Sequence, residues 1–243
     1  MRHLLSICLT GLLLCGLVSG QTTSSRPGPQ QAPLRIGLGL FGAALSGDIN
    51  DNGEEFYRFY PGVNLSLQFA NKKLISPQLT AGFGKFVAQN RDLGEVEGIR
   101  PNTFVETPFF FADLRFKARF LRQKGFQPYL SAGIGLLGYT PKDAEGNPLL
   151  DNFPTRKETE TYGSVTASFP LSIGFEVRMS PILTLGTEYT YRPSGSDYLD
   201  NIGELGTRSG NDRINTFALN LFITFDPENP VNFRNLKGRE RRD

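Results

Sequence analysis

The chain has 243 residues, with 26 basic and 24 acidic side chains, a formal net charge of +2 and 39% hydrophobic residues. The near balance of charge excludes the basic surface of a nucleic-acid-binding protein, and the hydrophobic content is too low for a bundle of membrane helices. Both cysteines and the single histidine fall at His3, Cys8 and Cys15, so the rest of the chain offers no disulfide, no thiol nucleophile and no imidazole for catalysis or zinc binding.

The first residues are predicted to be a secretory signal peptide over 1–20. Arg2 precedes an apolar run over 4–18, and small residues follow it. This order is typical of a cleaved signal, and the run is shorter than the about 20 residues of a membrane helix. Residues 21–33, rich in proline, glutamine and serine, are expected to form a periplasmic linker.

Apolar and polar side chains alternate in segments of about ten residues from residue 34 onward, as in strands with one apolar face. We predict eight strands, at 34–45, 60–70, 76–88, 104–120, 127–139, 165–179, 182–192 and 213–225.

The connections between these strands alternate in length. Short turns follow every second strand, and longer polar segments, among them 89–103, 140–164 and 193–212, separate the others. Short periplasmic turns and long extracellular loops are typical of transmembrane barrels, and an even number of strands returns both ends to the periplasm. The sequence thus predicts an all-β, eight-stranded antiparallel up-and-down transmembrane β-barrel over 34–225, in the outer membrane of a Gram-negative bacterium.

The stretch FADLRFKARF (111–120) tests whether the polar faces point inward. One face of this strand carries four charges: Asp113, Arg115, Lys117 and Arg119. In a soluble barrel these charges would face water. In a membrane barrel they must face the lumen, because a charge that faces hydrocarbon costs about 2–4 kcal/mol.

Three features favour the membrane barrel over the soluble one: the loop lengths, small residues on the polar faces, and an apolar face that continues over all strands with aromatic residues at its ends. A narrow lumen needs small side chains, whereas a solvated surface does not. The glycines are Gly37, Gly39, Gly82, Gly84, Gly133, Gly135, Gly174 and Gly186. The aromatic girdle residues are expected to be Tyr60, Phe86, Phe104, Tyr139, Tyr189, Tyr191 and Phe225.

The inward charges are expected to form a lumenal polar network with six cations and three carboxylates. Its members are Arg35, Asp113, Arg115, Lys117, Arg119, Glu176, Arg178, Glu188 and Arg192. Buried charges must be paired, so we expect Glu176 and Glu188 to pair with cations of this set. We interpret the network as a structural plug in a pore-free barrel rather than as a conduction pathway.

Two acidic loop segments are candidate interaction sites. The segment SDYLDNIGEL (196–205) contains Asp197, Tyr198, Asp200 and Glu204, and SGDINDNGEE (46–55) contains Asp48, Asp51, Glu54 and Glu55. Clustered carboxylates suit Ca²⁺, but the spacing does not match an EF-hand, and Asx turns with a Tyr/Leu anchor also explain the first segment. We favour the second explanation, and we predict no metal, cofactor or catalytic residue.

The last residues, 226–243, form a basic tail with Arg234, Lys237, Arg239, Arg241 and Arg242. Lys72, Lys73, Arg122 and Lys124 in the short turns would face the same compartment. The tail and turns are therefore candidates for docking a periplasmic partner, with a solvated, disordered end as the alternative for the tail.

Several stretches resemble a family of eight-stranded outer-membrane barrels that includes the PorG-like proteins of the type IX secretion system. They are QPYLSAGIGLLGYTPK (127–142), SFPLSIGFEVRMSPILTLGTEYTYR (168–192), GSDYLDNIG (195–203) and ALSGDIN (44–50). The resemblance covers most of 34–225, and Asp197–Asp200 is its most specific part.

The resemblance implies a non-enzymatic outer-membrane accessory subunit that contacts a periplasmic ring of a secretion machine. The alternative is a surface barrel whose long loops bind external ligands. Enzymatic barrels that modify lipids rely on a histidine with a serine, which the predicted mature chain does not offer.

Overall fold

The computed structural model describes residues 33–49, 58–69, 74–90, 95, 98–99, 102–120, 125–150, 156–157, 159–206 and 210–225. The predicted signal peptide, nearly all of the linker, the tail and the candidate turn lysines and arginine lie outside these ranges, as do Asp51, Glu54 and Glu55. Within the described ranges, no helix is long and apolar enough to cross a membrane.

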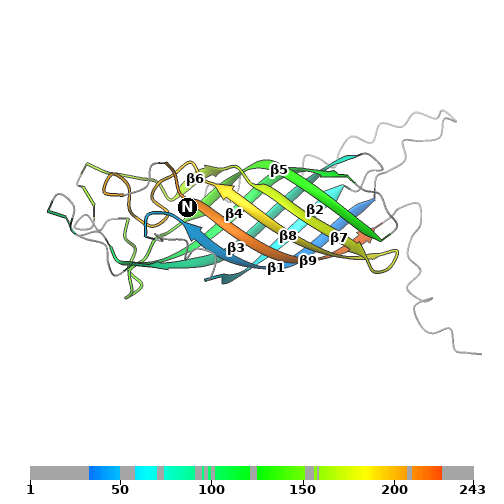
Figure 1. The fold of residues 1–243 in the computed structure, drawn as a ribbon, viewed down its shortest axis with the longest axis horizontal. Coiled ribbons are helices and arrows are strands. Elements are labelled where there is room, and N and C mark those ends of the chain that lie inside the picture. The colour runs from blue at the N-terminus through cyan, green and yellow to red at the C-terminus, as the bar shows by residue number, and fades with distance from the viewer. Residues whose placement is uncertain are drawn as a thin grey trace, which may run out of the picture. The chain divides into compact units, whose positions relative to one another are not determined.

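The described residues form one closed antiparallel sheet (Figure 1). Its segments are β1 (Leu34–Ser46), β2 (Tyr60–Phe69), β3 (Ile75–Gln89), β4 (Phe104–Arg119), β5 (Phe126–Tyr139), β6 (Val165–Ser168), β7 (Leu171–Arg178), β8 (Leu183–Pro193) and β9 (Arg213–Phe225). Successive strands pair with each other, and β1 pairs with both β2 and β9, which closes the ring.

The segments β6 and β7 are one strand of the ring. Both pair with β5 in the same register, and the gap between them falls at Phe169 and Pro170. The gap arises because proline has no amide hydrogen to donate to the ladder; the Pro170 carbonyl still accepts from Gly133. The ring therefore has eight strands, which confirms the predicted fold.

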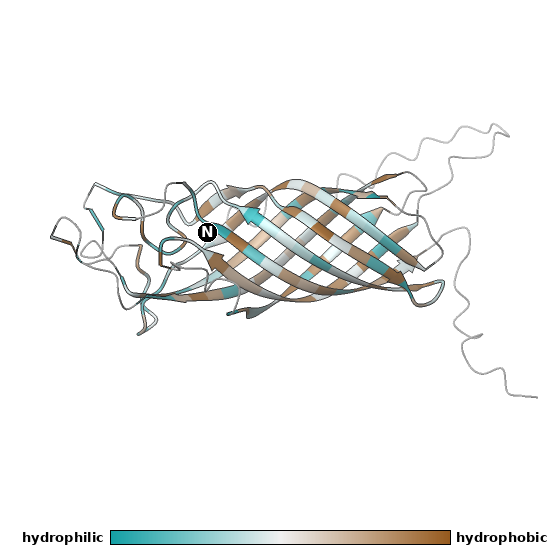
Figure 2. Ribbon diagram, in the orientation of Figure 1, coloured by the Kyte–Doolittle hydropathy of each residue, from teal (hydrophilic) through white to brown (hydrophobic). Residues whose placement is uncertain are grey.

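The exterior of the barrel is apolar, because the exposed side chains of the strands are mostly large hydrophobic ones. Figure 2 shows how hydrophobic and hydrophilic residues alternate along the strands. Leu38 is 64% exposed in mid-strand, and on β4 the outward side chains from Phe110 to Phe120 are all hydrophobic. At about 3.4 Å per residue and a typical tilt of about 40°, these ten steps rise about 26 Å, close to the about 25 Å apolar band of membrane barrels. Only a lipid bilayer can keep an apolar outer surface of this height out of contact with water.

Polar side chains mark the end of the apolar band nearest the long loops. On the outer surface, Lys85 forms an ion pair of 3.0 Å with Glu106, and both side chains are about 40% exposed. On another part of the ring, between β8 and β9, the Tyr189 hydroxyl donates to Asn215 at 2.9 Å. These groups suit the interface between lipid and water, where tyrosine rings and polar tips are both accommodated.

Two residues that we assigned to the aromatic girdle lie in the lumen instead. Phe86 is fully buried, and Tyr139 is 3% exposed. Both belong to an apolar cluster that fills the lumen toward the long loops, with Phe41, Phe109 and Phe111 among its members. The polar network therefore fills only the part of the lumen nearest the short turns.

Glycines on the inward faces make room for the large lumenal side chains. A Cβ atom at Gly37 would lie 2.5 Å from the ring of Phe222, and one at Gly174 would lie 2.6 Å from the Tyr129 hydroxyl oxygen. Phe222 and Tyr129 are both buried. The rings cross the lumen because their neighbours on adjacent strands have no side chain.

Candidate functional site

The inward charges form two linked groups, and Glu176 on β7 is the centre of the first. Its carboxylate accepts from Arg35 Nη1 and from Lys117 Nζ, each at 2.8 Å, and Arg119 Nη2 lies 3.7 Å away. The Glu176 side chain is 1% exposed. Lys117 also lies over the ring of Tyr129, 3.9 Å from its centroid.

The second group joins β4 to β8 through two carboxylates. Asp113 accepts from Arg115 at 2.7 Å and from Arg192 at 2.6 Å. Arg115 also donates to Glu188 at 2.8 Å, and the second oxygen of Glu188 accepts from the Tyr129 hydroxyl at 2.9 Å. All of these side chains are buried, so each charge depends on its partners in place of water.

Arg178 does not belong to the network, contrary to the sequence-based expectation. It is the last residue of β7, and its exposed guanidinium donates to the carbonyl oxygens of Ser180 and Pro181 in the following turn. At a strand end the side chain reaches turn carbonyls more readily than the lumen. The described network therefore has five cations and three carboxylates.

A second candidate site lies at the opposite end of the barrel, where residues 196–206 fold over the lumen. We call this segment the cap. Leu199 is fully buried and Ile202 is 2% exposed, and both pack in the apolar lumenal cluster. Asp200 Oδ1 accepts from the amide of Ile202, an Asx turn, and its Oδ2 accepts from the amide of Ile49 in the first loop.

Polar contacts join the cap to two other long loops. The Asn102 side chain donates to the carbonyl oxygen of Asp200 at 3.0 Å. Asn201, which adopts a positive φ of 64°, accepts from Tyr162 at 2.7 Å and from Arg156 at 3.0 Å. These contacts tie segments of the loops 90–103, 140–164 and 194–212 together.

Three tyrosines reinforce the contact between the cap and the loop 140–164. The rings of Tyr162 and Tyr198 stack with centroids 4.7 Å apart, and the ring of Tyr139 stacks with that of Tyr162 at 6.2 Å. Burial raises the pKa of the Tyr162 hydroxyl, so this group remains a hydrogen-bond donor to Asn201 at neutral pH. Offset aromatic pairs of this kind contribute about 0.5–1.5 kcal/mol each.

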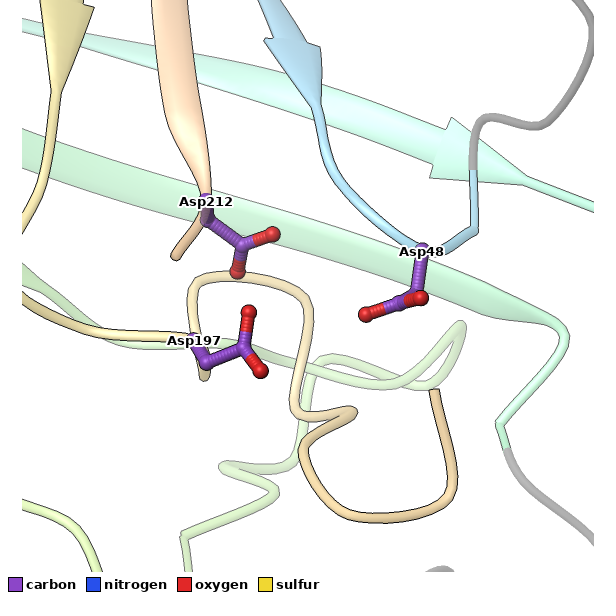
Figure 3. A group of neighbouring side chains, drawn as sticks. All are labelled: Asp48, Asp197 and Asp212. Carbon is purple, nitrogen blue, oxygen red and sulfur yellow. The ribbon is translucent and has the colours of Figure 1, made fainter. Parts of the chain in front are cut away.

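Three aspartates from the first and the last long loop meet at the cap (Figure 3). Asp48 follows β1, Asp197 lies in the cap and Asp212 precedes β9, and one carboxylate oxygen of each lies within 4.8 Å of the others. A cavity of about 140 Å³ lies beside them, lined by Asp48, Asp212, Ser46 and Arg213 among others. The sequence segments pointed to Asp48 and Asp197 separately, and nothing local singled out Asp212.

Burial and nearby negative charges disfavour ionisation of Asp197, Asp200 and Asp212. Burial, followed by the charges of Asp48 and Glu160, raises the pKa of Asp197 to about 6. Burial raises the pKa of Asp200 to about 7, although the amides of Ile49 and Ile202 act in the opposite direction. The pKa of Asp212 is raised well above its usual range by burial and by the charge of Asp200.

The group of aspartates offers only carboxylate oxygens, the ligand type that Ca²⁺ takes. It offers no thiol or imidazole for zinc or for nucleophilic catalysis. In chemical terms, the aspartates can exchange protons near neutral pH or accept a hard cation.

Solved structures share the architecture of the ring. Neisserial surface protein A matches with a TM-score of 0.50 at 12% identity, over 79% of this chain and 97% of that one. The fold is that of an eight-stranded outer-membrane β-barrel. Together with the apolar exterior, this fold places the barrel in the outer membrane of a Gram-negative bacterium, as predicted.

Two further barrels match over similar lengths. Ail, the attachment invasion locus protein of Yersinia pestis, solved with the heparin analogue sucrose octasulfate, has a TM-score of 0.47 at 12% identity, over 80% of this chain and 99% of Ail. OprG from Pseudomonas aeruginosa has a TM-score of 0.44 at 9% identity, over 82% of this chain and 98% of OprG. The sequence matches no protein-family model and no curated protein.

Proposed function

We propose that the protein is a non-enzymatic interaction barrel that acts at the cell surface through its cap and the loops joined to it. The observation that supports this most directly is that Asn201 contacts both Asn102 and Tyr162, which joins described segments of three long loops. A surface that is already ordered loses less conformational entropy on binding than separate flexible loops would.

An exposed turn on the loop 140–164 is the best placed contact point for an external ligand. Residues 144–148 are exposed. The turn is held by Asp143, whose carboxylate accepts from the Asn147 amide at 2.7 Å, and the buried Leu149 anchors it to the barrel. Ala144 and Glu145 therefore offer side chains that can be changed without disturbing the packing below.

A role as an accessory barrel of a type IX-like secretion complex is a second proposal. It is supported by the resemblance of 127–142, 168–192 and Asp197–Asp200 to PorG-like proteins. Such a subunit would act from the periplasmic side, through the short turns and the basic tail, which lie outside the described residues.

Two variants in a strain lacking the native gene distinguish the proposals. The first combines Ala144→Arg with Glu145→Arg in the exposed turn, and the second ends the chain after Phe225. Folding of both is checked by the heat-dependent mobility of the barrel on gels. The binding of external ligands by intact cells should fall in the first variant only. This result would support the cell-surface function.

Loss of protein secretion in the second variant, with normal surface binding, would instead support the accessory role. Unchanged surface binding by the first variant and by the deletion strain would rule out the cell-surface function.

A further inference from the structure

The cap covers the apolar end of the lumen with two of its side chains. Leu199 and Ile202 are buried in the cluster that also contains Phe41 and Phe109. No residue of the cap belongs to a strand. The cap can therefore separate from the barrel without breaking the hydrogen-bond ladder of the sheet.

Carboxyl groups hold the cap to the first loop and to the residue before β9. We call this contact the seam. Asp200 accepts from the Ile49 amide at 3.1 Å, and Asp212 accepts from the Leu199 amide at 2.8 Å. A Cβ atom on Gly47 would lie 2.5 Å from an Asp212 oxygen and 2.7 Å from an Asp200 oxygen, so these two carboxyl groups lie close together.

Two more aspartates bring negative charge to the seam. Asp48 from the first loop and Asp197 from the cap each place a carboxylate oxygen within 4.8 Å of one of Asp212. Asp48 and Asp212 are 2% exposed, and Asp200 is fully buried. Because like charges in so small a buried space repel each other strongly, the closed cap favours protonation at the seam.

The other charged or titratable groups that face the cap or the seam come from several elements. Among the described residues they are Arg156, Lys157, Glu160 and Tyr162 of the loop 140–164, Tyr139 of β5, Arg213 of β9, and Tyr198 and Glu204 of the cap itself. Arginine and lysine stay protonated between about pH 5 and pH 8, and burial raises the pKa of the three tyrosines. The described part of the loop 90–103 contacts the cap through Asn102, which does not titrate. In this pH range the carboxyl groups are therefore the ones whose charge changes.

The protonation equilibria agree with this geometry. Burial raises the pKa of Asp200 to about 7, and burial together with the charges of Asp48 and Glu160 raises the pKa of Asp197 to about 6. An aspartate in an open, solvated cap ionises near pH 4. The closed cap thus binds protons more tightly than the open cap, so the ratio of closed to open falls as pH rises from about 4 to about 7 and then stays constant.

We propose that the cap is a proton-dependent lid, which closes over the apolar end of the lumen when the carboxyl groups of the seam are protonated and lifts when they ionise. Lifting withdraws Leu199 and Ile202 from the apolar cluster and releases the loops that the cap joins. As a regulation of surface binding, the lid rests on the function proposed above. The movement itself is measured without any ligand, so either proposal can fail without the other.

The experiment measures the reactivity of a thiol at position 199 in the full chain, refolded into lipid vesicles. Leu199→Cys places the thiol inside the apolar cluster, where a water-soluble maleimide reaches it only when the lid lifts. Cys8 and Cys15 are replaced by serine, and a chelator removes divalent cations. The labelling rate is divided by that of Ala144→Cys in the exposed turn, which corrects for the pH dependence of the thiol.

The ratio of the two rates should rise with pH. From about pH 5.5 to about pH 8, the shift of the Asp200 pKa alone predicts a rise of about 30-fold. Asp200→Asn combined with Asp212→Asn should remove most of this rise, because asparagine keeps an accepting oxygen without a charge. Glu204→Gln changes a carboxylate of the cap that is 60% exposed and should leave the rise unchanged.

The proposal is overturned if the ratio for Leu199→Cys does not rise with pH, or if the double variant keeps the whole rise. Should the double variant fail to fold, Asp197→Asn decides the question. Because the pKa of Asp197 is about 6, this change should reduce the rise about fourfold. An undiminished rise in this variant would then overturn the lid.

Discussion

Replacing Glu176 by glutamine is the most direct perturbation of the polar core. Glutamine keeps the size of the side chain but removes the negative charge that Arg35, Lys117 and Arg119 share. Arg35 and Lys117 would then remain buried without a carboxylate in contact among the described residues. We expect the free energy of unfolding to fall by about 3–5 kcal/mol, as when one partner of a buried ion pair is removed.

The expected shift is large enough to measure in a urea titration. For an m-value of about 2 kcal/mol per molar, a loss of about 4 kcal/mol lowers the urea midpoint by about 2 M. Unfolding can be followed by the heat-dependent gel mobility of the barrel in vesicles and by tyrosine fluorescence, because the chain has no tryptophan.

The control is Glu106→Gln, which removes a carboxylate from an ion pair of nearly the same length. Glu106 and Lys85 are about 40% exposed, so this change should cost no more than about 1 kcal/mol. If Glu176→Gln costs no more than Glu106→Gln, the lumenal pairing does not stabilise the barrel. The same conclusion follows if Glu176→Gln and Glu188→Gln together leave heat-resistant folding unchanged.

Three further predictions concern the exterior and the cap. Leu38→Arg should destabilise the barrel in vesicles by about 2–4 kcal/mol in a urea titration, because Leu38 faces the hydrocarbon; no change would contradict the proposed lipid-facing surface. Leu199→Ala, which empties a fully buried position, should cost about 2–5 kcal/mol locally. Amide exchange in 196–206 should then accelerate at least about 30-fold, and equal acceleration in the barrel strands would show that the cap is not a separate unit. The exchange protection of the Ile49 and Ile202 amides, corrected for intrinsic rates, should fall as pH rises from about 4 to about 7 and then level off. The reason is that the pKa of Asp200 is about 7 in the closed cap, whereas an exposed aspartate ionises near pH 4, so the closed state loses its advantage as pH rises. Asp200→Asn should abolish this dependence, and a protection that rises with pH would refute the reasoning.

The sequence by itself determined the ring of strands and which side chains face inward. Backbone geometry sends successive side chains to opposite faces, so Asp113 and Arg115 could be assigned to the lumen from position alone. The same rule places Phe111 and Phe41 inside, since they share the register of Asp113 and Arg35. The apolar part of the lumen was therefore readable from residue positions, although Phe86 and Tyr139 were assigned to the aromatic girdle.

Only the tertiary structure decided which charges meet. Closing the ring lets side chains of strands that do not pair with each other meet inside one narrow lumen. The Glu176 carboxylate on β7 therefore contacts Arg35 on β1 and Lys117 on β4. Strand periodicity is a local property, whereas these contacts depend on the register of every pair around the ring. The meeting of Asp48, Asp197 and Asp212 at the cap arises in the same way, because the loops that carry them fold against one another over the apolar cluster.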